Sequence, residues 1–101
     1  MVEVNWANQA IEDINNIARF IAKDSEKYAI IQTNRFFERA KILESLPLSG
    51  KVVPEMNTRF IRELNIGNYR IIYLIVNKSR VDILTIHNGY RLLKNSPAFK
   101  R

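Results

Sequence analysis

Residues 59–91 read RFIRELNIGNYRIIYLIVNKSRVDILTIHNGYR, and they decide the fold of this chain. Three short apolar segments alternate with turn residues, which predicts strands over Phe60–Leu64, Tyr69–Val76 and Val81–His87. The connections at residues 65–68 and 77–79 are short and contain Asn, Gly or Ser, so both are predicted to be hairpins. The second segment is almost continuously apolar, which indicates a central strand with both faces at least partly covered.

The residues before this stretch predict a short strand and two helices. Val2–Trp6 alternates apolar and polar side chains, as a half-buried strand does. A helix is expected from Ala7, with Asn5 or Asn8 as its N-cap, because apolar residues then recur at spacings of three and four: Ile11, Ile14, Ala18 and Ile21.

A second helix is expected over about Glu26–Ser45, and the Asp24-Ser25 break before it offers an N-cap. Its core stripe consists of Ala29, Phe36, Ala40 and Leu43, widened by Ile30, Ile31 and Phe37. The short break between the helices predicts an antiparallel helical hairpin. Pro47 and Gly50 end the second helix, and residues 51–58 are expected to form a loop.

This order of elements predicts an α+β fold. An N-terminal strand and a helical hairpin precede a three-stranded antiparallel meander, and the helices pack on one face of the sheet. The 101 residues suffice for one domain, expected to span residues 1–101. No apolar run is long enough to cross a membrane and no signal-peptide pattern is seen, so the expected location is the cytoplasm.

The net charge of +6 is distributed unevenly. Residues 1–58 carry 7 Lys/Arg and 8 Asp/Glu, whereas residues 59–101 carry 9 Lys/Arg and 2 Asp/Glu. An excess confined to the C-terminal part points to an acidic partner, either nucleic acid or protein, with plain solubility as the alternative.

Several kinds of chemistry are excluded or disfavoured by the residues present. The chain has no Cys and one His, so thiolate chemistry and two-histidine metal sites are excluded, and no carboxylate cluster replaces them. There is no glycine-rich phosphate loop, and no serine lies in a nucleophile context. No metal or other cofactor is therefore expected.

The remaining candidates are cations around the predicted sheet. They comprise Lys51, Arg59, Arg62, Arg70, Arg80, Arg91 and Lys94. Guanidinium groups bind phosphate or carboxylate through paired hydrogen bonds, which favours a polyanion site. For each arginine alone, an internal ion pair, for example with Glu63, is an equally good interpretation.

One histidine and three tyrosines complete the candidate set. His87 could transfer a proton near neutral pH, or could instead fix the turn that follows its strand. Tyr69 and Tyr73 share a parity with Ile71 and Ile75, which favours core packing, so Tyr90 is the better candidate for stacking on a base.

Taken in order, these features resemble the RelE/ParE toxins of type II toxin–antitoxin modules. The resemblance covers roughly residues 2–92 and rests on an ordered set of motifs: the strand, the helical hairpin, the Pro47…Gly50 turn, Arg62-Glu63-Leu64, Tyr69-Arg70-Ile71-Ile72-Tyr73 and His87…Arg91. It implies a small basic protein that arrests bacterial growth and is neutralised by a tightly bound cognate antitoxin.

The two branches of this family imply different targets. RelE-like members cut mRNA in the ribosomal A site without a metal, and for that branch the resemblance implies catalytic roles for Arg70 and Arg91, with His87 as a further candidate. ParE-like members poison DNA gyrase. In either branch, Lys51, Arg59, Arg62, Arg70, Tyr90, Arg91 and Lys94 are the expected contacts with the target.

Two departures from the RelE branch favour the ParE-like interpretation. The lysine-rich stretch before the central strand is reduced to Lys51 with Arg59 and Arg62, and residues 95–99 (NSPAF) offer no counterpart of a C-terminal tyrosine that some relatives use. The ribonuclease remains the alternative within the family. A non-catalytic nucleic-acid-binding module is the alternative outside it.

Overall fold

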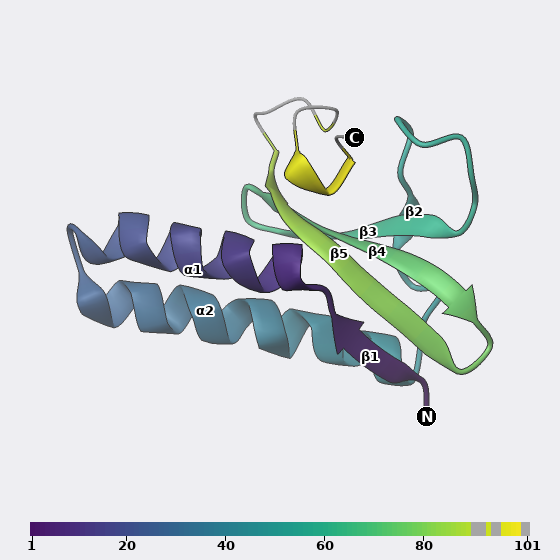
Figure 1. Cartoon of the computed structure of the whole chain (residues 1–101). Helices are drawn as coiled ribbons and strands as arrows, with labels where there is room; N and C mark the ends of the chain where they lie inside the picture. The colour runs from purple at the N-terminus through teal and green to yellow at the C-terminus, as the bar shows by residue number, and fades with distance from the viewer. Residues whose placement is uncertain (90–92, 94–95, 100–101) are drawn as a thin grey trace.

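The fold combines a helical hairpin with a five-stranded sheet (Figure 1). It is seen in a computed structural model, which describes residues 1–89, 93 and 96–99. The elements, in chain order, are β1 (Glu3–Trp6), α1 (Asn8–Ala22), α2 (Glu26–Ala40), the 3₁₀ helix η1 (Lys41–Glu44), β2 (Lys51–Val52), β3 (Ile61–Ile66), β4 (Tyr69–Asn77), β5 (Arg80–Asn88) and the 3₁₀ helix η3 (Pro97–Phe99). The predicted α+β class is confirmed.

The sheet has the strand order β1-β5-β4-β3-β2. Its centre is the predicted meander, in which β4 pairs antiparallel with both β3 and β5. The N-terminal strand β1 lies at one edge and runs parallel to β5, with Val4 opposite Val81. The expectation of a loop over residues 51–58 was wrong at its start, because Lys51 and Val52 form the edge strand β2 opposite Glu63 and Arg62.

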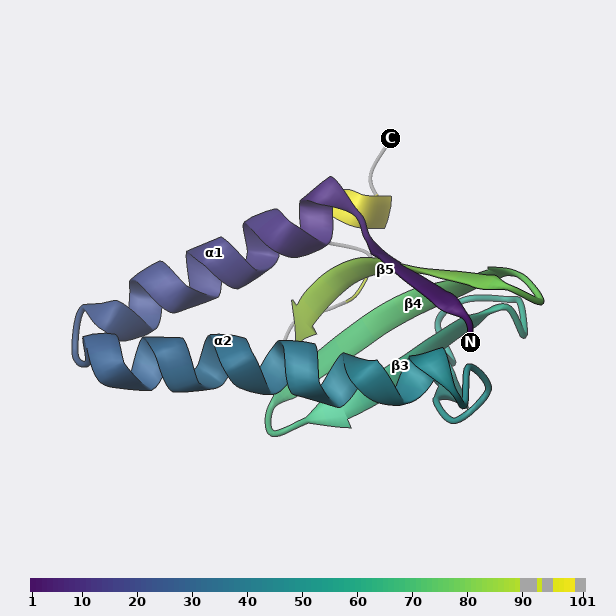
Figure 2. The same ribbon diagram turned by 90° about the horizontal axis from the view of Figure 1, so that it is seen from below.

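The helical hairpin lies on one face of the sheet, and its closed end extends beyond the sheet (Figure 2). Ser25 caps α2 as expected, since its hydroxyl accepts a hydrogen bond from the Tyr28 N–H at 3.0 Å. The expected caps Asn5 and Asn8 were wrong: Ala7 is the N-cap of α1, and no side chain caps that end. The α-helical part of the second helix ends at Ala40, earlier than predicted, and η1 continues the turn.

The main core lies between the hairpin and the sheet face that it covers, which we call the helix face. Its buried members come from both layers: Ala10, Ile14, Phe36, Ala40, Leu43, Leu64, Ile71, Tyr73, Val81, Ile83 and Ile86. Tyr69 and Ile75 pack against this core, so the predicted packing role of Tyr69 and Tyr73 is confirmed. The prediction that Ile30, Ile31 and Phe37 widen the core stripe was wrong for Ile30 and Ile31, which are exposed on α2. Phe37 is also partly exposed, but its ring packs beside the main core on Trp6, with ring centroids 4.7 Å apart.

A second, smaller core covers the other side of the sheet, which we call the opposite face. Val53, Ile72 and Leu93 are buried there, with Met56, Ile61 and Phe99 packed around them. Ile71 and Ile72 are both fully buried but belong to different cores, as alternation along a strand requires. The prediction that both faces of the central strand are at least partly covered is therefore confirmed.

Candidate functional site

The predicted site residues Arg70 and His87 are brought together by the pairing of β4 and β5. They are direct cross-strand partners, and Arg70 also faces Asn65 on β3. Both share the parity of Ile72 and Thr85, which places them on the opposite face. His87 is buried, with 5% of its surface exposed.

Arg70 is held between two carboxylates. Its Nε donates to Glu63 Oε2 at 2.8 Å, and its Nη2 donates to the same oxygen. The outer end of the guanidinium binds Glu55 through both oxygens, with Nη1–Oε2 at 2.8 Å and Nη2–Oε1 at 2.9 Å. The internal ion pair considered from the sequence is therefore present, and it includes a second carboxylate that the sequence did not suggest.

The two carboxylates differ in their exposure to solvent. The Glu63 side chain is 5% exposed and that of Arg70 15%, whereas Glu55 is 43% exposed. The hydrogen bonds from Arg70 are the main cause that lowers the pKa of Glu55 from 4.5 to about 2. The hydrogen bonds to Glu55, the largest cause, and to Glu63 raise the pKa of the Arg70 guanidinium.

Two further predicted contacts, Lys51 and Arg59, take part in different interactions. Lys51 Nζ lies 3.7 Å from Glu63 Oε1. Its side chain is 65% exposed, which makes it the most exposed member of the charged cluster formed by Lys51, Glu55, Glu63 and Arg70. Arg59 is exposed, and its guanidinium lies 5.0 Å from the ring centroid of Phe60.

Arg62 holds backbone segments together. Its guanidinium donates to the carbonyls of Arg59 at 3.1 Å and Gly50 at 3.0 Å, with a longer bond of 3.4 Å to Leu48. These bonds tie the turn before β2 to the start of β3. They explain why an arginine lies within a strand, and no external anion is needed for that explanation.

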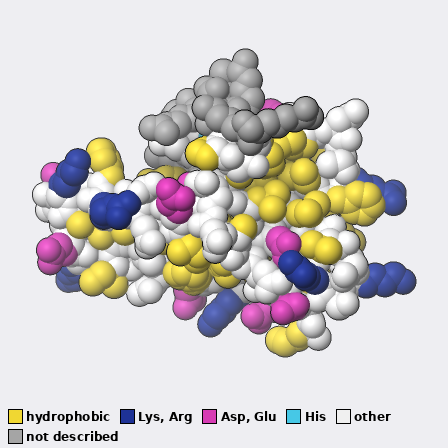
Figure 3. Space-filling view, viewed as in Figure 1, with side chains coloured by type: hydrophobic (Ala, Val, Ile, Leu, Met, Phe, Trp, Pro, Cys, Tyr) yellow, Lys and Arg dark blue, Asp and Glu magenta, His cyan; other side chains and the backbone are white. Residues whose placement is uncertain are grey.

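The positive charge does not form one continuous surface among the residues that Figure 3 draws in colour. On that face, dark blue and magenta side chains are intermixed. The candidate Arg80 is itself paired with an acidic residue, because its Nε donates to Asp82 Oδ1 at 2.8 Å. The predicted contacts Tyr90, Arg91 and Lys94 lie outside the described residues.

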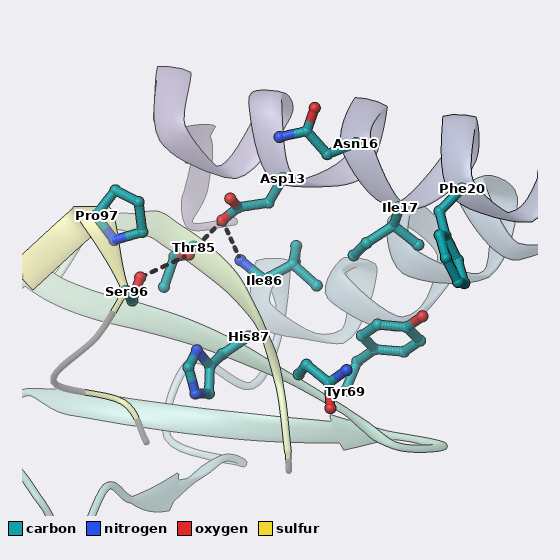
Figure 4. Close-up of a pocket in the computed structure, with 11 residues that line it drawn as sticks. Asp13, Asn16, Ile17, Phe20, Tyr69, Thr85, Ile86, His87, Ser96 and Pro97 are labelled. Atoms are coloured by element: carbon teal, nitrogen blue, oxygen red, sulfur yellow. Dashed lines mark hydrogen bonds between the residues drawn. The ribbon is translucent and has the colours of Figure 1, made fainter. Parts of the chain in front are cut away.

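A pocket of about 390 Å³ opens where α1 passes the end of β5 (Figure 4). It is lined by Asp13, Asn16, Ile17, Phe20, Tyr69, Thr85, Ile86, His87, Asn88, Ser96 and Pro97. At its edge, Asp13 Oδ2 accepts hydrogen bonds from the Thr85 hydroxyl and from the Ile86 N–H, the latter at 3.1 Å. Asp13 therefore supplies the hydrogen-bond acceptor that the edge of β5 lacks just beyond Ile83, where the pairing with β1 ends.

Two acidic residues of these sites, Glu55 and Asp13, were missed by reasoning from the sequence. Glu55 follows Pro54 in a segment with no periodic pattern, and Asp13 is one of several charged residues on a helix. The residues next to Glu55 and Asp13 in the sequence do not indicate these contacts, because each side chain binds a partner far along the chain.

The described part of the chain offers no group of three or more His, Asp or Glu side chains arranged to hold a metal ion. Nor does any helix in that part have the length and apolar character needed to cross a membrane.

Comparison with known proteins identifies the family of this chain. The sequence profile of the ParE toxin of the type II toxin–antitoxin system parDE matches residues 4–93. No curated protein sequence matches the chain significantly.

Solved structures support the same fold. One is a chain of the chromosomal ParDE toxin–antitoxin system from P. aeruginosa, with a TM-score of 0.72 and 18% identity, covering 87% of this chain and 96% of that one. Another is a chain of the toxin–antitoxin complex RelBE2 from Mycobacterium tuberculosis, with a TM-score of 0.62 and 21% identity, covering 86% of this chain and 96% of that one. The structures show the shared fold and the profile shows the family: this chain belongs to the ParE toxins of type II toxin–antitoxin systems.

Proposed function

We propose that this toxin acts in the cytoplasm by inhibiting DNA gyrase and is neutralised by a cognate antitoxin protein. The match of the ParE profile over residues 4–93 is the observation that carries this proposal. The solved relatives come from ParDE and RelBE toxin–antitoxin systems, which supports a protein antitoxin as partner.

The contacts of Arg70 support gyrase over mRNA as the target. A ribonuclease that uses no metal needs cations free to stabilise the charge of a phosphorane-like transition state. Arg70 already binds Glu63 on its inner edge and Glu55 on its outer end. The buried Glu63 offsets the charge of the guanidinium even when the more exposed Glu55 moves aside, so Arg70 is poorly prepared to stabilise a phosphorane.

The experiment compares two assays on the same purified protein. We expect inhibition of gyrase supercoiling and no discrete cuts in mRNA in a translating extract. Lys51→Ala and Arg59→Ala are expected to weaken the inhibition, because both side chains are exposed and we propose them as contacts with the target. Lys27→Ala, on α2, is the matched control for loss of one exposed positive charge. Intact supercoiling at saturating toxin would refute the gyrase target.

Growth measurements test the toxin function separately from the target. Induction of this chain alone is expected to slow bacterial growth, and co-expression of the protein encoded by the neighbouring gene is expected to restore it. Normal growth at high toxin levels would contradict the toxin function itself.

The RelE-like ribonuclease is a second candidate because Arg70 and His87 lie side by side across β4 and β5. It predicts discrete mRNA cuts that are lost in His87→Ala. Arg70→Lys, which keeps the positive charge but loses the planar fork, would also reduce cutting. This candidate fails if the mRNA remains intact while gyrase is inhibited.

A further inference from the structure

The two edges of the Arg70 guanidinium are used differently. Glu63 holds the inner edge through Nε and Nη2, and at 5% exposure it is part of the protein interior. Glu55 binds the outer end through Nη1 and Nη2 with both carboxylate oxygens, and it is 43% exposed. Glu63 therefore orients the guanidinium, while Glu55 occupies the end that faces solvent.

Release of Glu55 requires little disturbance of the fold. The neighbouring backbone is anchored independently, since the Val53 N–H donates to the Ile61 carbonyl at 3.1 Å and the Met56 N–H donates to the Val53 carbonyl at 3.2 Å. Val53 itself is fully buried. Rotation of the partly exposed Glu55 side chain is sufficient to uncover Nη1 and Nη2.

The uncovered site has the charge and shape to bind one carboxylate. Without Glu55, the cluster retains the positive charges of Arg70 and Lys51 and the negative charge of Glu63, which leaves one net positive charge. The end of the guanidinium would again offer two parallel N–H donors, the geometry that already holds a planar carboxylate there.

The surroundings favour a protein segment over a nucleic acid. One net positive charge can pair with a single carboxylate, whereas a nucleic acid would bring a charge at every nucleotide close to the buried Glu63. Met56 and Ile61 pack around the second core but are only partly buried, and their remaining apolar surface suits a segment that mixes acidic and apolar residues.

We propose that Arg70 forms a carboxylate-binding site for an acidic segment of a protein partner, and that Glu55 is its built-in occupant, which the partner displaces. Glu55 thus lowers the affinity of the site for any other carboxylate. The inference is independent of the gyrase target, since its test contains neither gyrase nor ribosomes.

The test measures peptide binding to the wild-type chain, to Glu55→Gln and to the control Glu38→Gln. Glu38 lies exposed on α2, so its replacement makes the same change in net charge away from Arg70. The probe is a terminally blocked peptide of alternating Glu and Leu, with a Gln/Leu peptide and single-stranded oligo(dT) as the other two ligands. Calorimetry at fixed ionic strength gives the affinities, because salt weakens ion pairs near the surface.

We expect Glu55→Gln to bind the Glu/Leu peptide about tenfold more tightly than the wild type, the equivalent of about 1.4 kcal/mol. Glu38→Gln should match the wild type, and the Gln/Leu peptide should show no gain. In Glu55→Gln, the Arg70 side-chain N–H resonances should shift when the Glu/Leu peptide is added, which locates the binding without a variant that removes Arg70.

Three results would overturn the inference. They are equal affinities of wild type and Glu55→Gln for the Glu/Leu peptide, a gain of the same size in Glu38→Gln, and unperturbed Arg70 resonances on peptide binding. A gain seen only with oligo(dT) would also refute it, and would assign the site to phosphodiesters.

Discussion

The hydroxyl of Tyr73 on the central strand donates a hydrogen bond to the carbonyl of Pro47 at 2.7 Å and accepts one from the Gly50 N–H at 3.0 Å. Tyr73 is fully buried, and burial is the main cause that raises the pKa of its phenol. One side chain of β4 therefore fixes both ends of the turn that leads from the helical hairpin into the sheet.

Removal of this hydroxyl should destabilise the fold. Tyr73→Phe leaves the buried Gly50 N–H and the Pro47 carbonyl without their partner, at a cost of about 1–3 kcal/mol. Urea denaturation should show a lower midpoint with an unchanged slope. Tyr28→Phe, at a tyrosine that is 47% exposed, is the control and should leave the midpoint where it is.

Gly50 should tolerate no side chain. A Cβ at this position would lie 2.6 Å from the Tyr73 hydroxyl oxygen and 2.7 Å from the backbone carbonyl oxygen of Glu63. The backbone of β3 cannot move away without breaking its pairing, so Gly50→Ala should cost about 1–3 kcal/mol. Ser49→Ala, at the exposed neighbouring residue, serves as the control in thermal unfolding. Equal melting temperatures for the two variants would argue against this packing.

Asp13 should protect the edge of β5 from exchange with solvent. Asp13→Ala removes the acceptor of the Ile86 N–H and of the Thr85 hydroxyl, which is almost fully buried. We expect a loss of about 1–3 kcal/mol and faster hydrogen exchange at Ile86 than at Ile71 on the neighbouring strand. Glu12→Ala, on the exposed side of α1, should change neither.

The stability of the protein should depend on pH through Glu55. Its pKa is lowered in the folded state, from 4.5 to about 2, so the Arg70–Glu55 pair stabilises the fold above pH 4.5. That contribution is lost as the pH falls through about 2. Because Glu55 is 43% exposed and therefore screened by solvent, we expect a contribution of at most about 1 kcal/mol.

Denaturation midpoints of the wild type and Glu55→Gln, measured from neutral pH down to about pH 2, check this dependence. The variant should be less stable at neutral pH, and the difference should shrink as the pH falls through the range between the two pKa values. Parallel pH profiles would show that Glu55 does not titrate with a lowered pKa.

The sequence determined the elements whose cause is local. Short apolar segments between turn residues predicted β3, β4 and β5, and a Ser25 cap with apolar residues at helical spacing predicted α2. Parity along β4 was sufficient to place Tyr73 in the core, because successive side chains of a strand point to opposite faces. The succession of these elements was also sufficient for the resemblance that the family profile confirms.

Only the tertiary structure decided which elements and charges meet. β1 pairs with β5 although paired residues such as Val4 and Val81 lie 77 positions apart in the chain. Two residues of an expected loop become β2 because β3 lies beside them. Arg70 and Arg62 could be read from the sequence as binding a polyanion or as internally paired. The fold brings Glu55 to Arg70 across 15 residues and Asp13 to Thr85 across 72, and such contacts depend on packing at long range, which no local pattern encodes.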